Sequence, residues 1–351
     1  METNSDITVV VTGATGYIAR HVIVQALDAG YRVRGTARSD GAVDALRTEL
    51  REFVADPISV DRFDVVTADL MSDDGWTEVM QGATYALHVA SPIPSAPPKD
   101  PNELIVPARE GTLRVLRAAR DNGVRRVVLT SSLAAVLYGV DRDKVFTEAD
   151  WSNPDDRRIG ASEQSKTYAE RAAWQFIDEE GNDLELAVIN PGLVLGPLCG
   201  PSGSTSVEAV SKLMNREFPA CPDFTYAMVD VRDVAAAHLA AMTSMAAAGQ
   251  RHLCALDSCS LRDVAAILAA EYGPQGYRIP TGRLPGVMVR LVAKFDKVAA
   301  LALNDLSNPQ RIDNSRVLAL LGRPLRTLDE MTVATADSLI ANGMLKPPKR
   351  R

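Results

Sequence analysis

The first half of the chain alternates short apolar runs with segments of helical spacing. The apolar runs, which we expect to form strands, lie at 7–11, 31–36, 63–68, 85–89, 126–130 and 184–189. The segments of helical spacing lie at 17–29, near 43–53, in a long stretch ending at Asn122, and at 162–180. Near-continuous Val, Ile and Leu runs are typical of strands covered on both faces, and their alternation with helices is typical of βαβ units. The pattern predicts a doubly wound α/β fold around a parallel sheet.

The pattern changes after Pro191, where Gly- and Pro-rich segments interrupt a shorter strand and helix pair. From Cys259 onward the chain is mostly helical, with prolines between the helical segments. Ligands of open parallel sheets bind at the carboxyl edge, so we expect a smaller lobe that closes over this edge. We predict a nucleotide-binding Rossmann-type domain at 1–195 with about 226–258, a smaller, mostly helical substrate-binding lobe at 196–225 and 259–345, and a tail at 346–351.

The segment TGATGYIA at 12–19 follows the first expected strand and opens the first expected helix, which is the context of a dinucleotide-binding turn. Gly13 permits the tight turn, and Gly16 lets a pyrophosphate approach the backbone. The helix that begins here supplies N–H groups and a partial positive charge for the phosphates. We therefore predict a dinucleotide site that also includes Thr15, Tyr17 and Ile18.

The end of the second expected strand indicates which dinucleotide binds. NAD sites place an acidic residue there, roughly 20 residues after the glycines, to bind the ribose 2′-hydroxyl. Residues 34–39 read RGTARS and contain no acid, whereas Arg38 could grip a 2′-phosphate through two N–H groups. We favour NADP(H) over NAD. Asp69 and Leu70, at the end of the third strand, either contact the adenine or cap a helix.

Composition narrows the class of protein further. Apolar residues make up 46% and charged residues 24%, which suits a globular chain with a sizeable core. The net charge of −7 argues against nucleic-acid or anionic-membrane partners, which need a basic face. Four cysteines without paired spacing and four histidines predict neither a metal site nor a disulfide scaffold. The N-terminus lacks the layout of a signal peptide and no apolar run approaches about 18 residues, so we expect a cytoplasmic protein.

Nine motifs in order then identify a family resemblance. They are TGATGYIA (12–19), VRGTARS (33–39), ADL (68–70), HVASP (88–92), GTLRVLRAA (111–119), RRVVLTSSLAAV (125–136), SKTYAERAAW (165–174), NPGLVLGP (190–197) and MVDVRDVAAAH (228–238). With these motifs the chain resembles the extended short-chain dehydrogenases/reductases, in the branch of dihydroflavonol reductases, cinnamoyl-CoA reductases and bacterial aldehyde reductases. The likeness extends from about residue 6 to 345.

The resemblance implies a catalytic Ser, Tyr and Lys. It places the serine at Ser132, which would bond the substrate carbonyl, and the lysine at Lys166, which would bond the nicotinamide ribose and lower the pKa of the phenol. The tyrosine belongs four residues before the lysine, one helical turn away, but this position is Ser162. Tyr168, two residues after Lys166, points to another side of the helix, and we interpret it as a packing residue.

A serine at position 162 has three explanations. The first is an engineered replacement of tyrosine. The second is that the chain is a natural homologue that binds NADP(H) without rapid turnover. The third is a changed mechanism that uses the vacated space for a water or a larger substrate. An aliphatic hydroxyl is a weaker acid than a phenol and is shorter by one aromatic ring. The loss of a positioned general acid typically costs about 10²–10⁴-fold in rate.

The resemblance also implies roles for residues around the nicotinamide. The backbone of Ala90, Ser91 and Pro92 would line its ribose, and Pro191 and Val194 would face its amide. As candidate substrate contacts we name Tyr138, Phe218 and Tyr226. His88 is interpreted as a buried core histidine, and Asp230, Arg232 and Asp233 as a structural charge network near the hinge of the two lobes.

The sequence thus predicts an NADPH-dependent reductase of aldehydes or ketones, reversibly an alcohol dehydrogenase, impaired by Ser162. Its substrate would be a small carbonyl compound or alcohol. Two alternatives remain open: a non-enzymatic NADP(H)-binding or regulatory protein, and a nucleotide-sugar epimerase or dehydratase. Family members often pair through the helix preceding the fifth strand and the helix of the Tyr/Lys motif, so a homodimer is expected.

Overall fold

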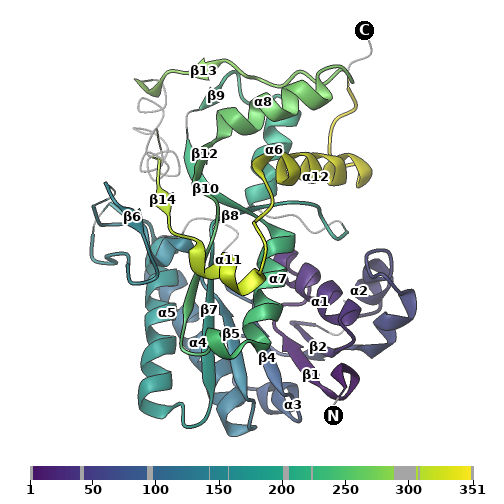
Figure 1. Cartoon of the computed structure of the whole chain (residues 1–351), viewed down its shortest axis with the longest axis vertical. Coiled ribbons are helices and arrows are strands. Elements are labelled where there is room, and N and C mark those ends of the chain that lie inside the picture. Colours follow the sequence, from purple (N-terminus) through teal and green to yellow (C-terminus); the bar gives the residue numbers. More distant parts are fainter. Residues whose placement is uncertain are drawn as a thin grey trace.

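A seven-stranded parallel sheet forms the centre of the molecule (Figure 1). The computed structural model describes residues 3–39, 43–92, 98–141, 143–156, 158–200, 205–222, 224–287, 306 and 309–348. The strand order is β11-β7-β5-β4-β1-β2-β3. The strands are β1 (Thr8–Val11), β2 (Arg32–Ala37), β3 (Phe63–Thr67), β4 (Tyr85–His88), β5 (Arg126–Thr130), β7 (Glu185–Pro191) and β11 (Arg251–Cys254). The predicted doubly wound fold is confirmed.

Helices cover both faces of this sheet, as the Val-rich strands require. Val9 and Val11 of β1 pack into one apolar cluster and Val10 packs into another, because alternate side chains of a strand point to opposite faces. The first cluster includes α1 (Tyr17–Asp28) and α7 (Val231–Thr243), and the second includes α3 (Trp76–Met80), α4 (Asn102–Asp121) and α5 (Ala161–Glu180). The helix α2 (Val43–Leu50) lies beside β3.

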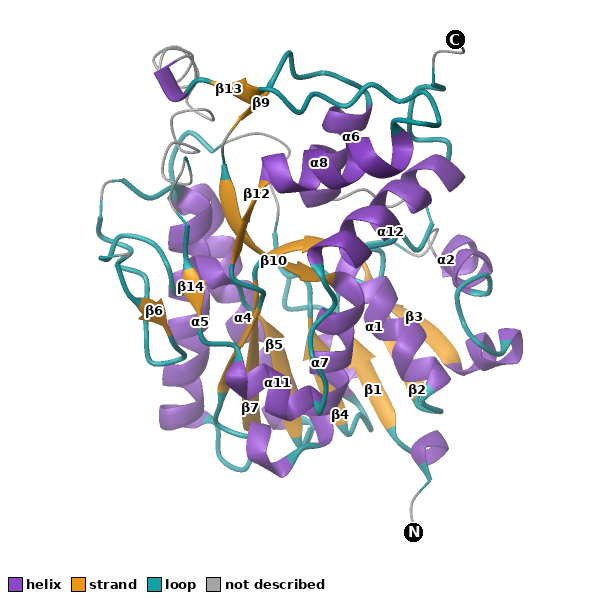
Figure 2. Ribbon diagram, turned by 45° about the horizontal axis from the view of Figure 1, so that its top comes forward, coloured by secondary structure: helices purple, strands orange, loops and turns teal. Residues whose placement is uncertain are grey.

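A second group of strands and helices lies at the carboxyl end of the sheet (Figure 2). A second sheet joins β8 (Leu193–Leu195), β10 (Thr225–Asp230) and β12 (Ser258–Ser260). Around it lie α6 (Thr205–Met214), α8 (Leu261–Tyr272) and α12 (Leu328–Ala341), with α12 packed against both α8 and α6. A short parallel pair joins β9 (Cys221–Pro222) and β13 (Arg283–Leu284). The sequence pattern predicted neither the β8–β10–β12 sheet nor β11.

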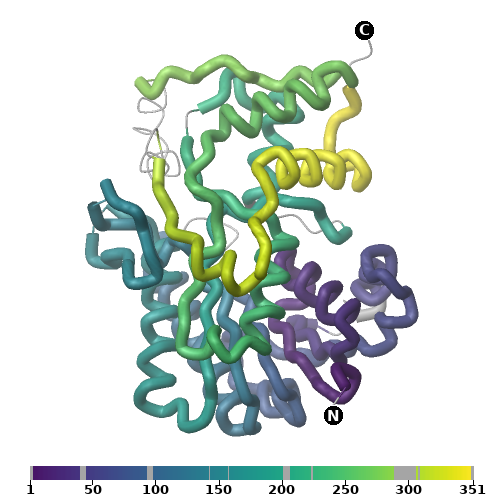
Figure 3. Tube along the Cα trace, viewed as in Figure 1, coloured from purple at the N-terminus to yellow at the C-terminus, as the bar shows by residue number. Residues whose placement is uncertain are grey.

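The C-terminal segment runs back along the nucleotide domain before it reaches the lobe (Figure 3). β14 (Arg311–Ile312) pairs with β6 (Val145–Phe146), and α11 (Ser315–Leu321) packs on α7 and β11. The chain then rises into α12. The residue ranges of the two domains stay a prediction, and residues 349–351 of the expected tail lie outside the described residues.

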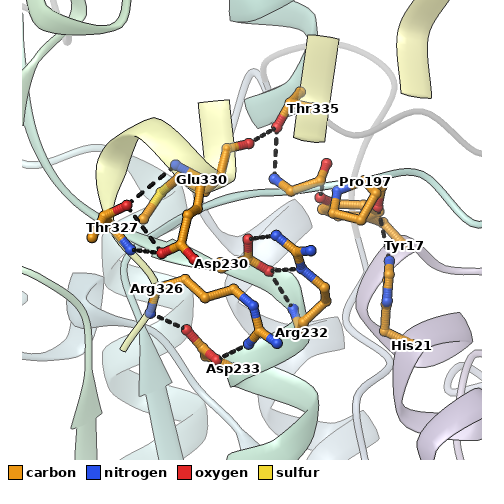
Figure 4. Close-up of polar contacts among 12 residues, drawn as sticks. Tyr17, His21, Pro197, Asp230, Arg232, Asp233, Arg326, Thr327, Glu330 and Thr335 are labelled. Atoms are coloured by element: carbon orange, nitrogen blue, oxygen red, sulfur yellow. Dashed lines mark hydrogen bonds and ion pairs between the residues drawn. The ribbon is translucent and has the colours of Figure 1, made fainter. Parts of the chain in front are cut away.

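Charged side chains join α7 to the segment that leads into α12 (Figure 4). Asp230 accepts the backbone N–H of Arg232 at 2.8 Å and pairs with its guanidinium at 2.6 Å. Asp233, which is buried, accepts the backbone N–H of Arg326 at 2.7 Å and pairs with the guanidinium groups of Arg326 and Arg323. The expected charge pairs are present, and their place at a hinge between two lobes stays a prediction.

Within the described part of the chain, no helix combines the length and the apolar character needed to cross a membrane.

Candidate active site

The turn between β1 and α1 is held close to its neighbours by backbone contacts. Gly13 has φ +69°, and a β-carbon there would lie 3.0 Å from Cβ of Ala90. The Gly13 N–H donates to Thr36 Oγ1 at 3.0 Å, and the next N–H, of Ala14, donates to the carbonyl of Thr36 at 2.8 Å. Only glycine combines this left-handed conformation with so close an approach. The glycine turn is thus held between the carboxyl ends of β2 and β4.

One cavity of about 900 Å³ opens at this edge of the sheet. It collects residues from the glycine turn, from the ends of β2, β3, β4, β5 and β7, and from α5. The predicted site residues that line it are Gly13, Thr15, Gly16, Tyr17, Ile18, Arg38, Asp69, Leu70, Ala90, Ser91, Pro92, Ser132, Lys166, Pro191 and Val194. Residues dispersed over 180 positions of sequence therefore meet in one place, although their roles in binding stay predictions.

Arg38 lies one residue beyond the end of β2, and its exposed side chain belongs to the cavity wall. The next strand contributes Asp69 and Leu70. Asp69 Oδ1 accepts the N–H of Met71 at 2.9 Å, so this carboxylate stabilises a turn while it borders the cavity. The guanidinium of Arg114 donates to the carbonyl of Leu70. Arg114 thus holds this turn in place, a role that the sequence did not reveal.

The other end of the cavity holds Ser132 and Lys166. Lys166 Nζ donates to Ser91 Oγ at 3.0 Å. Burial lowers the pKa of Lys166 to about 8, and the nearby carboxylate of Glu170 acts in the opposite direction. Ser132 caps the short helical turn after β5 because its Oγ accepts the N–H of Ala134 at 3.1 Å. While its oxygen accepts this hydrogen bond, the hydroxyl of Ser132 can still donate one to a carbonyl oxygen.

Ser162 differs from these residues in its surroundings. It is the second residue of α5, it is exposed, and it is not among the residues that line the cavity. Tyr168 does not substitute for the missing phenol, because its hydroxyl donates to Asp155 Oδ1 at 3.2 Å. Among the described residues that line the cavity, Tyr17 is the only tyrosine, and its buried hydroxyl donates to the carbonyl of Gly196 at 2.8 Å. Burial raises the pKa of this phenol, so it is a poor proton donor.

His88 is buried and bonds Thr12 through Nδ1 and Oγ1 at 2.8 Å. Burial and the ammonium of Lys166 lower the pKa of His88 to about 3, so the ring is neutral at physiological pH. The interpretation of His88 as a core histidine is confirmed.

The three residues named as substrate contacts are not among those lining the cavity. Tyr226 lies on β10 and its ring is 6.4 Å from that of Phe224. Phe218 packs against the main apolar core, and Tyr138 packs against a smaller cluster near β6. The side of the cavity next to the lobe is lined instead by Ser206, Val207, Glu208 and Ser211 of α6, Leu339 of α12 and Met344. The sequence offered no signal for them because only the packing of α6 and α12 brings them here.

A parallel sheet with a glycine turn and a cavity at its carboxyl edge defines a Rossmann-type dinucleotide-binding protein. The model of the NAD dependent epimerase/dehydratase family matches residues 9–254, and the chain belongs to this family. Cinnamoyl-CoA reductase 1 of Petunia hybrida is 37% identical over 277 residues, which cover 78% of this chain and 79% of the relative. The resemblance to the reductase branch is confirmed.

Two solved reductases have the same fold over nearly their whole length. The structure of the yeast methylglyoxal/isovaleraldehyde reductase Gre2 complexed with NADPH superposes with a TM-score of 0.79 at 28% identity, covering 97% of this chain and 100% of that chain. Gre2 from Candida albicans, also solved with NADPH, gives a TM-score of 0.77 at 30% identity, covering 96% and 99%.

Proposed function

We propose that this chain is an NADPH-dependent reductase of aldehydes and ketones in which the step of proton donation is impaired. The observation that carries the proposal is the meeting of Ser132 and Lys166 with the glycine turn and Arg38 in one cavity. Relatives and structural neighbours support the same activity, since they include a cinnamoyl-CoA reductase and a methylglyoxal/isovaleraldehyde reductase complexed with NADPH.

The cavity fits a dinucleotide of this kind. The absence of a β-carbon at Gly13 and the free start of α1, which has no side-chain cap, leave backbone N–H groups for a pyrophosphate. Arg38 at the rim suits a 2′-phosphate because its guanidinium can donate two parallel hydrogen bonds. Ser91, Pro92, Pro191 and Val194 border the opposite end, beside Lys166.

When bound, NADPH supplies the hydride that reduces the carbonyl carbon. The protein has four tasks in this reaction. The hydroxyl of Ser132 donates a hydrogen bond to the carbonyl oxygen and stabilises the negative charge that develops there. The ammonium of Lys166, with a pKa of about 8, is mostly charged at neutral pH and holds the ribose hydroxyls. Backbone at 90–92 and Pro191 orients the nicotinamide ring.

The fourth task, protonation of the alkoxide, lacks its usual side chain. A phenol one turn before Lys166 would reach the reacting oxygen and would be acidified by the ammonium. Ser162 is too short for direct contact and, being exposed, leaves this proton to water. Turnover at about 10⁻²–10⁻⁴ of a tyrosine-containing relative follows from the usual contribution of a positioned acid.

The test is NADPH oxidation against a panel of aldehydes and ketones by this chain and by its Ser162→Tyr and Ser162→Ala variants. We expect Ser162→Tyr to turn over rapidly and the unmodified chain slowly. Equal rates of the chain and Ser162→Tyr would mean that another group already supplies the proton and would overturn the impairment. A Ser162→Ala variant slower than the chain would show that the serine hydroxyl orders the water.

Ser162 is also the observation that favours a second candidate, a non-enzymatic NADP(H)-binding or regulatory protein. If all three proteins bind NADPH and none reduces any carbonyl compound, this second candidate replaces the first. Turnover of a nucleotide-sugar panel without net NADPH consumption would instead indicate an epimerase or dehydratase.

We further propose that the enzyme works in the cytoplasm as a homodimer formed through α4 and α5. These two helices pack against each other along one face of the sheet, and Val106 of α4 is a large apolar side chain that is 44% exposed. Light scattering of the purified chain and of Val106→Asp tests the dimer: we expect a dimer that the aspartate weakens, and a monomeric chain would contradict it.

A further inference from the structure

A buried carboxylate lies one helical turn beyond Lys166. Glu170 of α5 is fully buried, and donors from three other parts of the structure converge on it. Its Oε2 accepts the hydroxyl of Ser131 at 2.5 Å and Nδ2 of Asn190 at 2.7 Å, and its Oε1 accepts Nε of Arg251 at 2.6 Å. Trp174 Nε1 donates to Oε1 at 3.3 Å.

The residues that donate to Glu170 are chain neighbours of the candidate site residues. Ser131 precedes Ser132 at the end of β5, and Asn190 precedes Pro191 at the end of β7. The side-chain amide of Asn190 also donates to the carbonyl of Ser132 at 3.3 Å. One carboxylate therefore joins the helix that carries Lys166 to the two strand ends that border the reacting groups.

Arg251 of β11 holds this carboxylate in place. Its guanidinium lies 3.8 Å from the ring centroid of Trp151, and its Nη1 donates to the carbonyls of Glu148 and Asp150 at 2.9 and 2.6 Å. The arginine is almost fully buried, so its orientation is fixed from both sides. The carboxylate of Glu170 and the guanidinium of Arg251 both have several hydrogen-bond partners, which is the condition for a buried ion pair to persist.

Stability alone does not explain why this position carries a charge. Buried ion pairs are often no more stabilising than apolar side chains of the same volume. A carboxylate differs from an apolar side chain in two respects that matter here. It orients several donors at once, and its negative charge favours the ammonium form of Lys166 against the effect of burial. Of the other charged or titratable groups around Lys166, His88 is neutral and cannot supply this charge.

We propose that Glu170 is a positioning residue of the reductase, which Arg251 fixes and which sets the relative places of Ser132, Lys166 and Pro191. This inference rests on the proposed function. Misplacement of reacting groups by about 1 Å can cost about 10²-fold in rate, so a residue that touches neither substrate nor cofactor can still control turnover.

The test compares Glu170→Gln with Glu179→Gln, both in the Ser162→Tyr background. Glutamine keeps the volume but has one acceptor oxygen, so it cannot serve Ser131, Asn190 and Arg251 together. We expect kcat to fall about 10–100-fold, as for other outer partners of site residues, with little change in KM for NADPH. Glu179 is an exposed residue of the same helix, and its variant should match the background. Unchanged kcat in Glu170→Gln would overturn the proposal.

A double variant separates positioning from a structural role. Glu170→Gln leaves Arg251 buried without a carboxylate, which lowers Tm, whereas Glu170→Gln with Arg251→Gln removes both charges and should recover much of the Tm. We expect kcat to stay low in the double variant, because the neutral amide no longer favours the ammonium form of Lys166 and accepts weaker hydrogen bonds from Ser131 and Asn190 than a carboxylate does. Parallel recovery of Tm and kcat would mean that Glu170 serves stability only.

A measurement that needs no turnover tests the role of Glu170 even if the proposed reductase activity is absent. If Ser162→Tyr reduces no carbonyl compound, the proposed function fails, and NMR titration of isotopically labelled Lys166 in the full chain decides on Glu170. The resonance is assigned with Lys166→Arg. We expect its midpoint near 8 to move lower in Glu170→Gln and to stay unchanged in Glu179→Gln. An unmoved midpoint would contradict the coupling between the two residues.

Discussion

The cofactor end of the cavity and the proton-donor position differ in how they are built. At the cofactor end, the glycine turn is tied to β2 through two N–H bonds, and it lies so near Ala90, just after β4, that a β-carbon at Gly13 would be 3.0 Å away. At the expected proton-donor position, one exposed side chain, Ser162, stands where the resemblance implies a tyrosine. With the proposed roles, binding would depend on backbone geometry spread over several strands, whereas proton donation would depend on a single side chain.

Because of this difference, cofactor binding and proton donation can be lost separately. A change in one side chain on α5 removes the acid and leaves β1, β2 and β4 untouched. Conversely, disturbing the glycine turn weakens cofactor binding whatever stands at position 162.

The largest effect is expected from Ser162→Tyr. We expect kcat for aldehyde reduction to rise about 10²–10⁴-fold, which is the usual contribution of a positioned general acid. Ser162→Phe is the matched control, because it fills the same space with a ring that has no hydroxyl. Steady-state NADPH oxidation measures both. An equal rise in the two variants would attribute the gain to packing rather than to the phenol.

Arg38→Ala tests the other end of the cavity. Charge-assisted hydrogen bonds contribute about 1.5–3 kcal/mol, so we expect NADPH to bind roughly 10–100-fold more weakly and NADH to bind as before. Arg32→Ala is the control, since Arg32 is exposed at the opposite end of the same strand. Fluorescence titration with both nucleotides gives the Kd values. Equal weakening of NADPH and NADH would mean that Arg38 does not contact a 2′-phosphate.

Gly13→Ala should weaken both nucleotides alike. The left-handed conformation costs about 1–3 kcal/mol for a residue with a side chain, and the new methyl group would press on Ala90. Gly82→Ala is the control: Gly82 has a similar φ of +68° but open space around it. We expect both variants to lose some thermal stability and only Gly13→Ala to raise the Kd. A similar Kd in the two variants would contradict the tight fit of the turn.

The smallest effect concerns pH. Burial lowers the pKa of Lys166 to about 8, below the ordinary 10.5, so the ammonium is lost as pH rises through about 8. In Ser162→Tyr we expect kcat to fall above that pH, by up to about tenfold for each further pH unit. Between about 8 and 10.5 the unfolded chain binds more protons at this lysine than the folded chain, so this group's contribution to stability rises with pH. A pH–rate profile that stays flat to pH 10 would contradict the assignment.

The sequence predicted the parts of the structure that local constraints determine. The glycine turn was predictable because few residues other than glycine tolerate its conformation, and the central strands because runs such as 7–11 suit only a doubly covered sheet. The cavity lining from α6 and α12 was not predictable, since it depends on how the lobe packs. The same holds for Glu170 and Arg251, which are 81 residues apart and meet only when β11 joins the sheet.

The family resemblance indicated Ser132 and Lys166, but it gave no role to the other residues of the helix that carries the lysine. Glu170 lies in the motif SKTYAERAAW beside the lysine, where a charged residue on a helix usually faces water. Its complete burial was visible only in the structure. Arg114 likewise carried no sequence signal, whereas it bonds the carbonyl of Leu70 in the structure.

The most direct test is a paired titration of NADPH into this chain and into Ser162→Tyr. It asks whether cofactor binding is independent of the residue at position 162. Ser162 lies outside the cavity lining, so we expect the two Kd values to agree within about twofold, as is usual for independent sites. A chain that binds NADPH only after tyrosine is restored would contradict the separation of the two ends.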